Sequence, residues 1–184
     1  MAMNDDDGLK HFHVFSHAED RRPSEVVAAV AELGEGVHFV GQFIGSFQVY
    51  AHLKVAELGD AQQLVDDLWP RGLRTESSFE VRPSAIMGPK RRSPDFCALI
   101  RIRPKDDPFT VLDRLDEHFG PLFDEDAFWY GAAVVSGRFD LLVDLGRPSL
   151  DELVETVRTD LRSVPGIGKT ETSWADLRKN SIRR

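Results

Sequence analysis

The stretch Gly137-Arg138-Phe139-Asp140-Leu141-Leu142-Val143-Asp144-Leu145 repeats an earlier stretch, Gly45-Ser46-Phe47-Gln48-Val49-Tyr50-Ala51-His52-Leu53. The two align without a gap at a spacing of 92 positions. A second pair of similar segments, Thr75 to Phe79 and Thr170 to Trp174, follows the first pair in the same order at a spacing of 95 positions. Self-similarity at this period indicates one duplicated structural unit and not a solenoid of short repeats.

Each copy is predicted to contain four strands and two helices in the order βαββαβ. Prolines followed by apolar stripes predict helices from Pro23 and Pro108. The pairs Gly45-Ser46 and Gly137-Arg138 are typical of two-residue hairpins. We therefore predict an α+β fold of two tandem ferredoxin-like βαββαβ units, of the dimeric α+β barrel type. Units this small gain by packing together, which favours an intramolecular pseudo-dimer.

Capping signals predict where the second helix of each copy begins. Asp60 with Gln63, and Ser149 with Glu152, both resemble capping boxes. Between the copies, three prolines and the basic triplet Lys90-Arg91-Arg92 are typical of a linker. The predicted organisation is a disordered lead-in at 1–9, a first repeat at 10–82, a linker at 83–94, a second repeat at 95–177 and a basic tail at 178–184.

Composition narrows the class of protein. The chain of 184 residues has a net charge of −8 and a pI near 5.2, which disfavours direct binding to nucleic acid. The mean hydropathy is −0.30, no apolar run approaches membrane-spanning length, and the N-terminus is acidic where a signal peptide is basic. We expect a cytoplasmic protein without membrane contact. The single cysteine, Cys97, excludes an intrachain disulfide and is expected to be a small core residue.

The second hairpin and the strand that closes the second copy carry a family resemblance. Val134 to Val143, followed by an amphipathic helix and then by Val164 to Thr172, resembles the effector-binding (RAM-type) domain of the leucine-responsive/AsnC (feast/famine) regulators. The resemblance covers most of both copies. It implies a tandem duplication of that domain without the family's helix-turn-helix, because about ten residues precede the first strand and no DNA-reading module fits there.

The resemblance also implies a pocket for an amino acid or a similar small molecule at the hairpins. Arg138 could hold a carboxylate and Asp140 an ammonium group, beside backbone N–H groups that a glycine leaves accessible. The alternative is structural: Gly137 makes the turn, Arg138 is solvated and Asp140 caps it. The candidate effector-binding residues are Gly137, Arg138 and Asp140, with the degenerate counterparts Gly45, Ser46 and Gln48.

The histidines raise the alternative of a metal-binding or haem-binding enzyme. His11 and His13 are expected to share one face of a strand, where His52 or His17 could join them. Fused ferredoxin-like repeats also build dimeric α+β barrel enzymes, some with haem and some without a cofactor. The sequence has no His-Glu-x-x-His spacing, and strand histidines are commonly plain surface residues, so we expect no metal and no cofactor.

The aromatic run Phe128-Trp129-Tyr130 begins a predicted strand. Alternation along the strand places Trp129 on the face opposite to its two neighbours. One of the two faces must therefore be covered.

These observations favour a non-enzymatic domain that senses an amino-acid-like effector and is associated with transcription regulation, with no catalytic residues. The expected partners are the small-molecule effector and copies of the chain in a homo-oligomer. The alternative is a dimeric α+β barrel enzyme, such as a small monooxygenase or a haem-binding protein. A buried His, Tyr or Arg in a cavity between the sheets would indicate the enzyme. An open site at the Gly137 hairpin beside a neighbouring chain would indicate the sensor.

Overall fold

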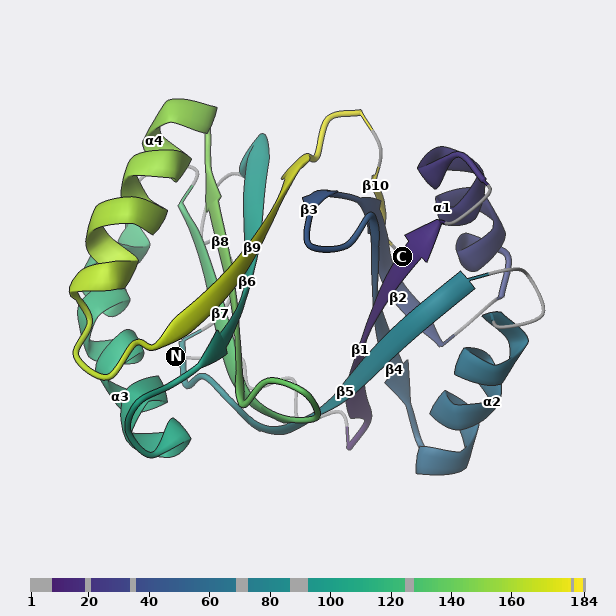
Figure 1. The fold of residues 1–184 in the computed structure, drawn as a ribbon, viewed down its shortest axis with the longest axis horizontal. Helices are drawn as coiled ribbons and strands as arrows, with labels where there is room; N and C mark the ends of the chain where they lie inside the picture. The colour runs from purple at the N-terminus through teal and green to yellow at the C-terminus, as the bar shows by residue number, and fades with distance from the viewer. Residues whose placement is uncertain are drawn as a thin grey trace.

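The computed structural model describes residues 8–18, 21–33, 36–68, 73–86, 93–124, 128–179 and 181–183. Within these ranges, each half contains the order β-α-β-β-α-β, to which the first half adds the short strand β3 and the second half adds η2, η3 and β10 (Figure 1). The elements of the first half are β1 (Lys10–Ala18), α1 (Pro23–Ala31), β2 (Val37–Gln42), β3 (Ile44–Gly45), β4 (Val49–Val55), α2 (Leu58–Leu68) and β5 (Leu73–Pro83). Those of the second half are β6 (Phe96–Arg103), α3 (Pro108–Phe119), the 3₁₀ turn η2 (Gly120–Asp124), β7 (Trp129–Ser136), β8 (Leu141–Arg147), α4 (Leu150–Glu155), its π-helical continuation η3 (Thr156–Leu161), β9 (Lys169–Asp176) and β10 (Ser181–Arg183).

The described strands form one antiparallel sheet in the order β10-β2-β4-β1-β5-β7-β8-β6-β9-β3. Its first half runs β2-β4-β1-β5 and its second half β7-β8-β6-β9, so both halves place their strands in the same relative order. The β5–β7 pairing joins the halves on one side, and the β3–β9 pairing joins them on the other. Because β3 directly follows β2 in the chain, the two ends of the sheet meet and the sheet closes on itself.

Three apolar layers hold this closed sheet together. Helices α1 and α2 cover the outer face of the first half, and α3 and α4 cover the outer face of the second (Figure 1). A third layer, which includes Phe15, Phe47 and Leu142, lies between the two halves of the sheet. Along β1 the side chains alternate, with Val14 in the helix-facing core and Phe15 in the layer between the sheets. The predicted α+β class is confirmed.

Local signals place most helix starts where the sequence predicts them. Helices α1 and α3 begin at Pro23 and Pro108, and the Asp107 side chain accepts a hydrogen bond from the Thr110 N–H at 2.9 Å. Ser149 caps α4 as predicted. The predicted cap at Asp60 is wrong: α2 begins at Leu58, and the Asp60 carboxylate lies inside its first turn and accepts from the Glu57 N–H.

The prediction of two-residue hairpins is also wrong. Strand β7 ends at Ser136 and β8 begins at Leu141, and β2 and β4 are separated by the short strand β3, which pairs with β9. Each connection is longer than a two-residue hairpin because it reaches across to the other half of the molecule.

The C-terminal segment returns to the first half of the sheet. Strand β10 pairs antiparallel with β2, with Ile182 opposite Val40. This part of the predicted basic tail is therefore a strand. The triplet Lys90-Arg91-Arg92 and residues 1–7 of the predicted lead-in lie outside the described residues. The predicted boundaries of the two repeats stay predictions. Among the described helices, none is long and apolar enough to cross a membrane.

Candidate functional site

The two glycine connections predicted to form effector sites are packed against the opposite half of the molecule. A Cβ atom at Gly45 would lie 2.7 Å from Ser173 Oγ, and a Cβ at Gly137 would collide with Ser78 Oγ. Ser46 donates its backbone N–H to Ser173 Oγ at 3.0 Å. The space beside each glycine is thus filled by the closing strand of the other half, β9 or β5.

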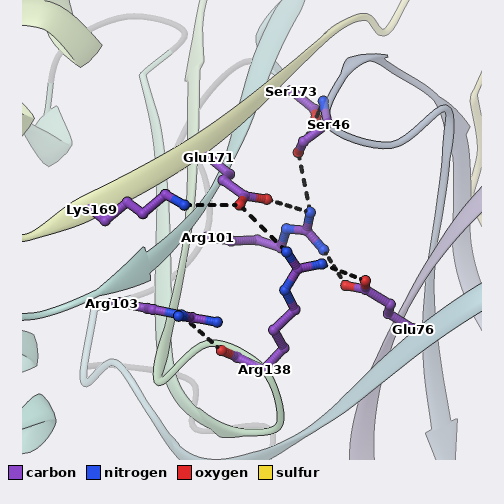
Figure 2. A network of polar contacts seen from close by, with 8 residues as sticks. All are labelled: Ser46, Glu76, Arg101, Arg103, Arg138, Lys169, Glu171 and Ser173. Atoms are coloured by element: carbon purple, nitrogen blue, oxygen red, sulfur yellow. Dashed lines mark hydrogen bonds and ion pairs between the residues drawn. The ribbon is translucent and has the colours of Figure 1, made fainter.

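A buried arginine that the sequence analysis did not single out lies between these connections (Figure 2). Only 4% of the Arg101 side chain is exposed, and its guanidinium binds Glu76 Oε2 at 2.9 Å and Glu171 Oε2 at 2.8 Å. Ser46 Oγ lies 3.3 Å from its Nη2. The rings of three phenylalanines surround the guanidinium, with centroids 4.6 to 5.2 Å away: Phe15, Phe47 and Phe139.

Arg138, whose side chain is about half exposed, belongs to the same network. Its guanidinium lies 2.7 Å from Glu76 Oε1 and 3.9 Å from Glu171 Oε1 (Figure 2). Burial raises the pKa of Glu76, but the hydrogen bond from Arg138 and the charge of Arg101 outweigh it and lower that pKa overall. The arrangement is a charge network that joins the two halves.

The remaining predicted site residues do not converge with Arg138. Asp140 is exposed, and its backbone N–H donates to the Ile102 carbonyl at 3.2 Å. The Gln48 side chain accepts a hydrogen bond from the Ala18 N–H at 2.8 Å, at the end of β1. Whether a ligand contacts any of the six residues stays a prediction.

A cavity of about 120 Å³ lies between the two halves of the sheet, partly open to solvent. Both halves line it, with five aromatic or histidine side chains from the first half and mostly apolar groups with one carboxylate from the second. Its lining residues are His38, Phe39, Phe43, Tyr50, His52, Pro94, Cys97, Leu99, Trp129, Asp144 and Leu177.

Strand alternation explains how several of these residues reach the cavity. Phe128 and Tyr130 are buried in the core beneath α3, whereas Trp129 lines the cavity, as predicted. Cys97 is buried in the layer between the sheets, which confirms it as a core residue.

Tyr50 is the end of a chain of polar contacts that runs away from the cavity wall. Its hydroxyl lies 2.8 Å from His13 Nδ1, and His13 Nε2 lies 3.2 Å from Glu80 Oε2. Burial raises the pKa of the Tyr50 phenol well above its usual value, and the nearby charges of Asp144 and Glu80 raise it further. The phenol is therefore protonated at neutral pH.

Further imidazoles lie beside this chain. His11 Nδ1 is 3.2 Å from His52 Nε2, and the rings of His13 and His52 stack at 5.0 Å. Burial lowers the pKa of His52 well below its usual value, and His13 and His11 lower it further. His11 and His13 share one face, as predicted, but they are not plain surface residues, because 16% and 6% of their side chains are exposed.

His17 stands apart from the other strand histidines. It lies on β1 near its end and is exposed. The signal that could have found the cluster is the co-occurrence of inward-facing histidines on two paired strands, with His13 directly opposite His52. Glu80 carried no such signal in the sequence.

The described residues do not fit a haem. The cavity between the sheets, at about 120 Å³, is smaller than the roughly 300 Å³ at which pockets for drug-sized ligands begin. The space between α3 and its sheet is filled by side chains such as Leu112, Leu115 and Phe119, each with 0% exposure. His118, on α3, is exposed at the surface.

Comparisons with known proteins place the fold among chlorite dismutases and monooxygenase-type proteins. No protein-family model and no curated protein matches the chain. A mutant chlorite dismutase from Candidatus Nitrospira defluvii superposes with a TM-score of 0.56 and 14% identity over 91% of each chain. A candidate monooxygenase from Fusobacterium nucleatum superposes with a TM-score of 0.56 and 7% identity over 96% of each chain. A candidate chlorite dismutase superposes with a TM-score of 0.58 and 10% identity over 91% of this chain and 96% of its own.

These comparisons correct the functional prediction. The prediction of a non-enzymatic effector sensor associated with transcription regulation is wrong, because the similar structures are chlorite dismutases and a monooxygenase-type protein. They agree with the alternative, the dimeric α+β barrel enzyme. The resemblance to the leucine-responsive/AsnC regulators is not tested by them and stays a prediction. At identities of 7% to 14%, the likeness establishes the fold.

Proposed function

We propose that the protein is a small-molecule enzyme of the monooxygenase kind, whose substrate binds in the cavity between the two halves of the sheet. The observation that carries this proposal is Tyr50 in the cavity wall, whose hydroxyl lies 2.8 Å from His13, with Glu80 beyond it. A hydroxyl, an imidazole and a carboxylate in line form the arrangement that moves a proton in general acid–base catalysis.

The chain of contacts supports a concerted proton relay. A substrate O–H placed at Tyr50 gives its proton to the phenol oxygen while the phenol proton passes to His13 Nδ1. Glu80, 3.2 Å from His13 Nε2, stabilises the imidazolium that forms. The raised pKa of Tyr50 disfavours a free phenolate, so the two transfers must occur together. The substrate becomes an electron-rich anion, the form in which phenols and enols react with molecular oxygen.

The cavity favours a small substrate with an apolar edge. Leu99 and Trp129 offer apolar surface, and Tyr50 and Asp144 are the groups that can orient a polar substituent. A single-ring phenol fits this description better than an extended molecule.

We further infer that the two halves are tandem ferredoxin-like units packed as an intramolecular pseudo-dimer. The identical strand order of the halves supports this, as does the reciprocal packing of Gly45 on Ser173 and Gly137 on Ser78. Under this proposal the site requires both units, since each supplies part of the cavity wall.

The test is oxygen consumption by the full chain with a panel of single-ring phenols. Tyr50→Phe removes only the hydroxyl that ends the relay, and we expect it to lower kcat by about 100-fold or more, the usual range for loss of a general acid–base group. The matched control is Tyr130→Phe. That tyrosine is also buried, but its hydroxyl donates to Asp116 at 2.7 Å in the core beneath α3.

Two results would contradict the proposal. One is oxygen consumption that is equal in Tyr50→Phe and the wild-type protein. The other is the absence of both binding and oxidation for every phenol, measured by thermal shift and by oxygen electrode. A ligand at about 100 times its Kd stabilises a fold by roughly 2.7 kcal/mol, so binding without turnover is detectable.

A further inference from the structure

Three side chains with metal-binding atoms converge at the inner face of the first half of the sheet. His52, His11 and Glu80 come from the adjacent strands β4, β1 and β5, and their nitrogen and oxygen atoms all lie within 4.8 Å of one another. From this convergence we propose that His11, His52 and Glu80 bind one divalent first-row transition metal ion. This site goes beyond the proposed proton relay and does not depend on it.

The distances suit such an ion. Metal–nitrogen and metal–oxygen bonds of about 2.0–2.2 Å place tetrahedral ligands roughly 3.4 Å apart. His11 Nδ1 lies 3.2 Å from His52 Nε2 and 3.7 Å from Glu80 Oε2. Those two separations bracket the required value. The ligand atoms of the remaining pair, His52 and Glu80, lie within 4.8 Å of each other, so binding requires them to approach by no more than about 1.4 Å.

The ligand set is of a recognised chemical kind. Two imidazoles and one carboxylate bind zinc in catalytic sites, and the same set on one face binds non-haem iron(II). In both cases three protein ligands leave coordination positions open to water or substrate. His52 also lines the cavity, so the ion would lie next to the space proposed for the substrate.

The surroundings hold the carboxylate in place. Only 11% of the Glu80 side chain is exposed, and His13 Nε2 lies 3.2 Å from its Oε2. Hydrogen bonds from a second layer of residues orient metal ligands and are needed for full affinity. Since a carboxylate has two oxygens with about four acceptor positions, Glu80 can contact His13 and a metal ion at once.

The register of the sheet produces this group from distant parts of the sequence. His52 on β4 is paired with His13, which lies two residues after His11 on β1. Phe79 on β5, the residue before Glu80, is paired with Phe12, the residue after His11. Strand alternation therefore turns His11, His52 and Glu80 to the same inner face.

The test is metal titration of the tag-free full chain after treatment with a chelator. Calorimetry with Zn²⁺ and the visible absorption of Co²⁺ report binding without any substrate, so the result is independent of the oxidation assay. We expect one ion per chain. His11→Asn, His52→Asn and Glu80→Gln should each weaken binding at least about tenfold, and His13→Gln by about 10- to 100-fold.

His17→Asn is the matched control, because His17 lies on the same strand as His11 but is exposed. It should leave both the stoichiometry and the affinity unchanged. The melting temperature of each chelator-treated variant shows whether it is folded; if His52→Asn is not, His11→Asn and Glu80→Gln decide. The proposal is overturned by absence of saturable binding, by binding that survives loss of His11 and Glu80, or by equal weakening in His17→Asn.

Discussion

Arg101 holds a positive charge between the two halves of the sheet, with 4% of its side chain exposed. Its partners Glu76 and Glu171 keep 34% and 20% exposure, so each retains some contact with water. Burying a charge is costly unless it is paired, and breaking a buried pair by removing one partner leaves the other uncompensated. In the network of Figure 2, Arg101 is therefore the charge that most needs its partners.

We expect Arg101→Met to lower the free energy of unfolding by about 1.5–3 kcal/mol, the usual range for a hydrogen bond to a charged group, because Glu76 and Glu171 lose a partner but keep Arg138 nearby. Urea denaturation of the full chain measures this. Arg103→Met is the control on the same strand, since Arg103 is exposed and its Nε donates to the Arg138 carbonyl at 3.2 Å. It should cost less than about 1 kcal/mol. Equal losses would show that the buried charge is not important for stability.

Glu76 makes the same network sensitive to acid. Its pKa is lower in the folded state than in the unfolded chain, because its bonds to Arg138 and Arg101 outweigh the effect of burial. Its contribution to stability is therefore complete above the unfolded pKa and is lost as the pH falls through the folded pKa. The difference in unfolding free energy between the wild-type protein and Glu76→Gln should shrink as the pH is lowered from about 6 to about 3, the range in which carboxyl groups titrate. A gap that is constant over urea titrations in this range would contradict the assignment.

Sequence reasoning could place Arg101 but not its partners. It stands between Ile100 and Ile102 in an apolar strand, so alternation places its side chain on the face of the sheet opposite to theirs. The carboxylates that neutralise it are 25 and 70 positions away in the sequence. No local pattern connects them, because the contact exists only after the two halves have closed.

Among the elements, the glycine connections show how one half fits the other. Gly45 has a φ of +146°, and a Cβ there would lie 2.6 Å from the Thr172 carbonyl oxygen, so both the backbone conformation and the close approach require glycine. At Gly59 in α2, by contrast, an added Cβ atom would have open space around it.

These two glycines give a matched test. We expect Gly45→Ala to destabilise the fold by about 1–3 kcal/mol, as overpacking does, because the backbone of β9 cannot move without disturbing its pairing with β6. Gly59→Ala should stabilise it by up to about 1 kcal/mol, since alanine favours the helix. Thermal and urea unfolding measure both. Similar effects of the same sign would contradict the close approach of Gly45 to β9.

The helices were predictable from local signals, whereas the connections were not. Pro23, Pro108 and Ser149 mark helix starts through interactions within a few residues, and the structure agrees. Gly45 and Gly137 were predicted to make tight hairpins. Their conformation is set instead by strands β9 and β5 of the opposite half, which a local pattern does not report.

In the whole molecule, closure of the sheet creates the cavity and the histidine cluster. Each half alone would leave its inner face, including Phe15 and Leu142, exposed to water. The sequence repeat could predict two halves that pack together, and alternation could turn His11 and His13 the same way. Sequence reasoning also named His52 as a possible neighbour, and the structure places His52 Nε2 3.2 Å from His11 Nδ1. It could not bring in Glu80, which lies 67 positions from His13.

The pairing of β10 with β2 has a consequence for biosynthesis. Strand β2 lies next to β4 on one side and β10 on the other, and β10 ends at Arg183. While the ribosome is still making residues 84 to 180, the first half lacks β10 at that outer edge, and it also lacks β7 and β9 until each of these strands has been made. An unpaired edge invites pairing with other chains. The nascent protein therefore passes through a stage in which the β2 edge is open to association with another copy, and pairing of β10 with β2 ends that stage.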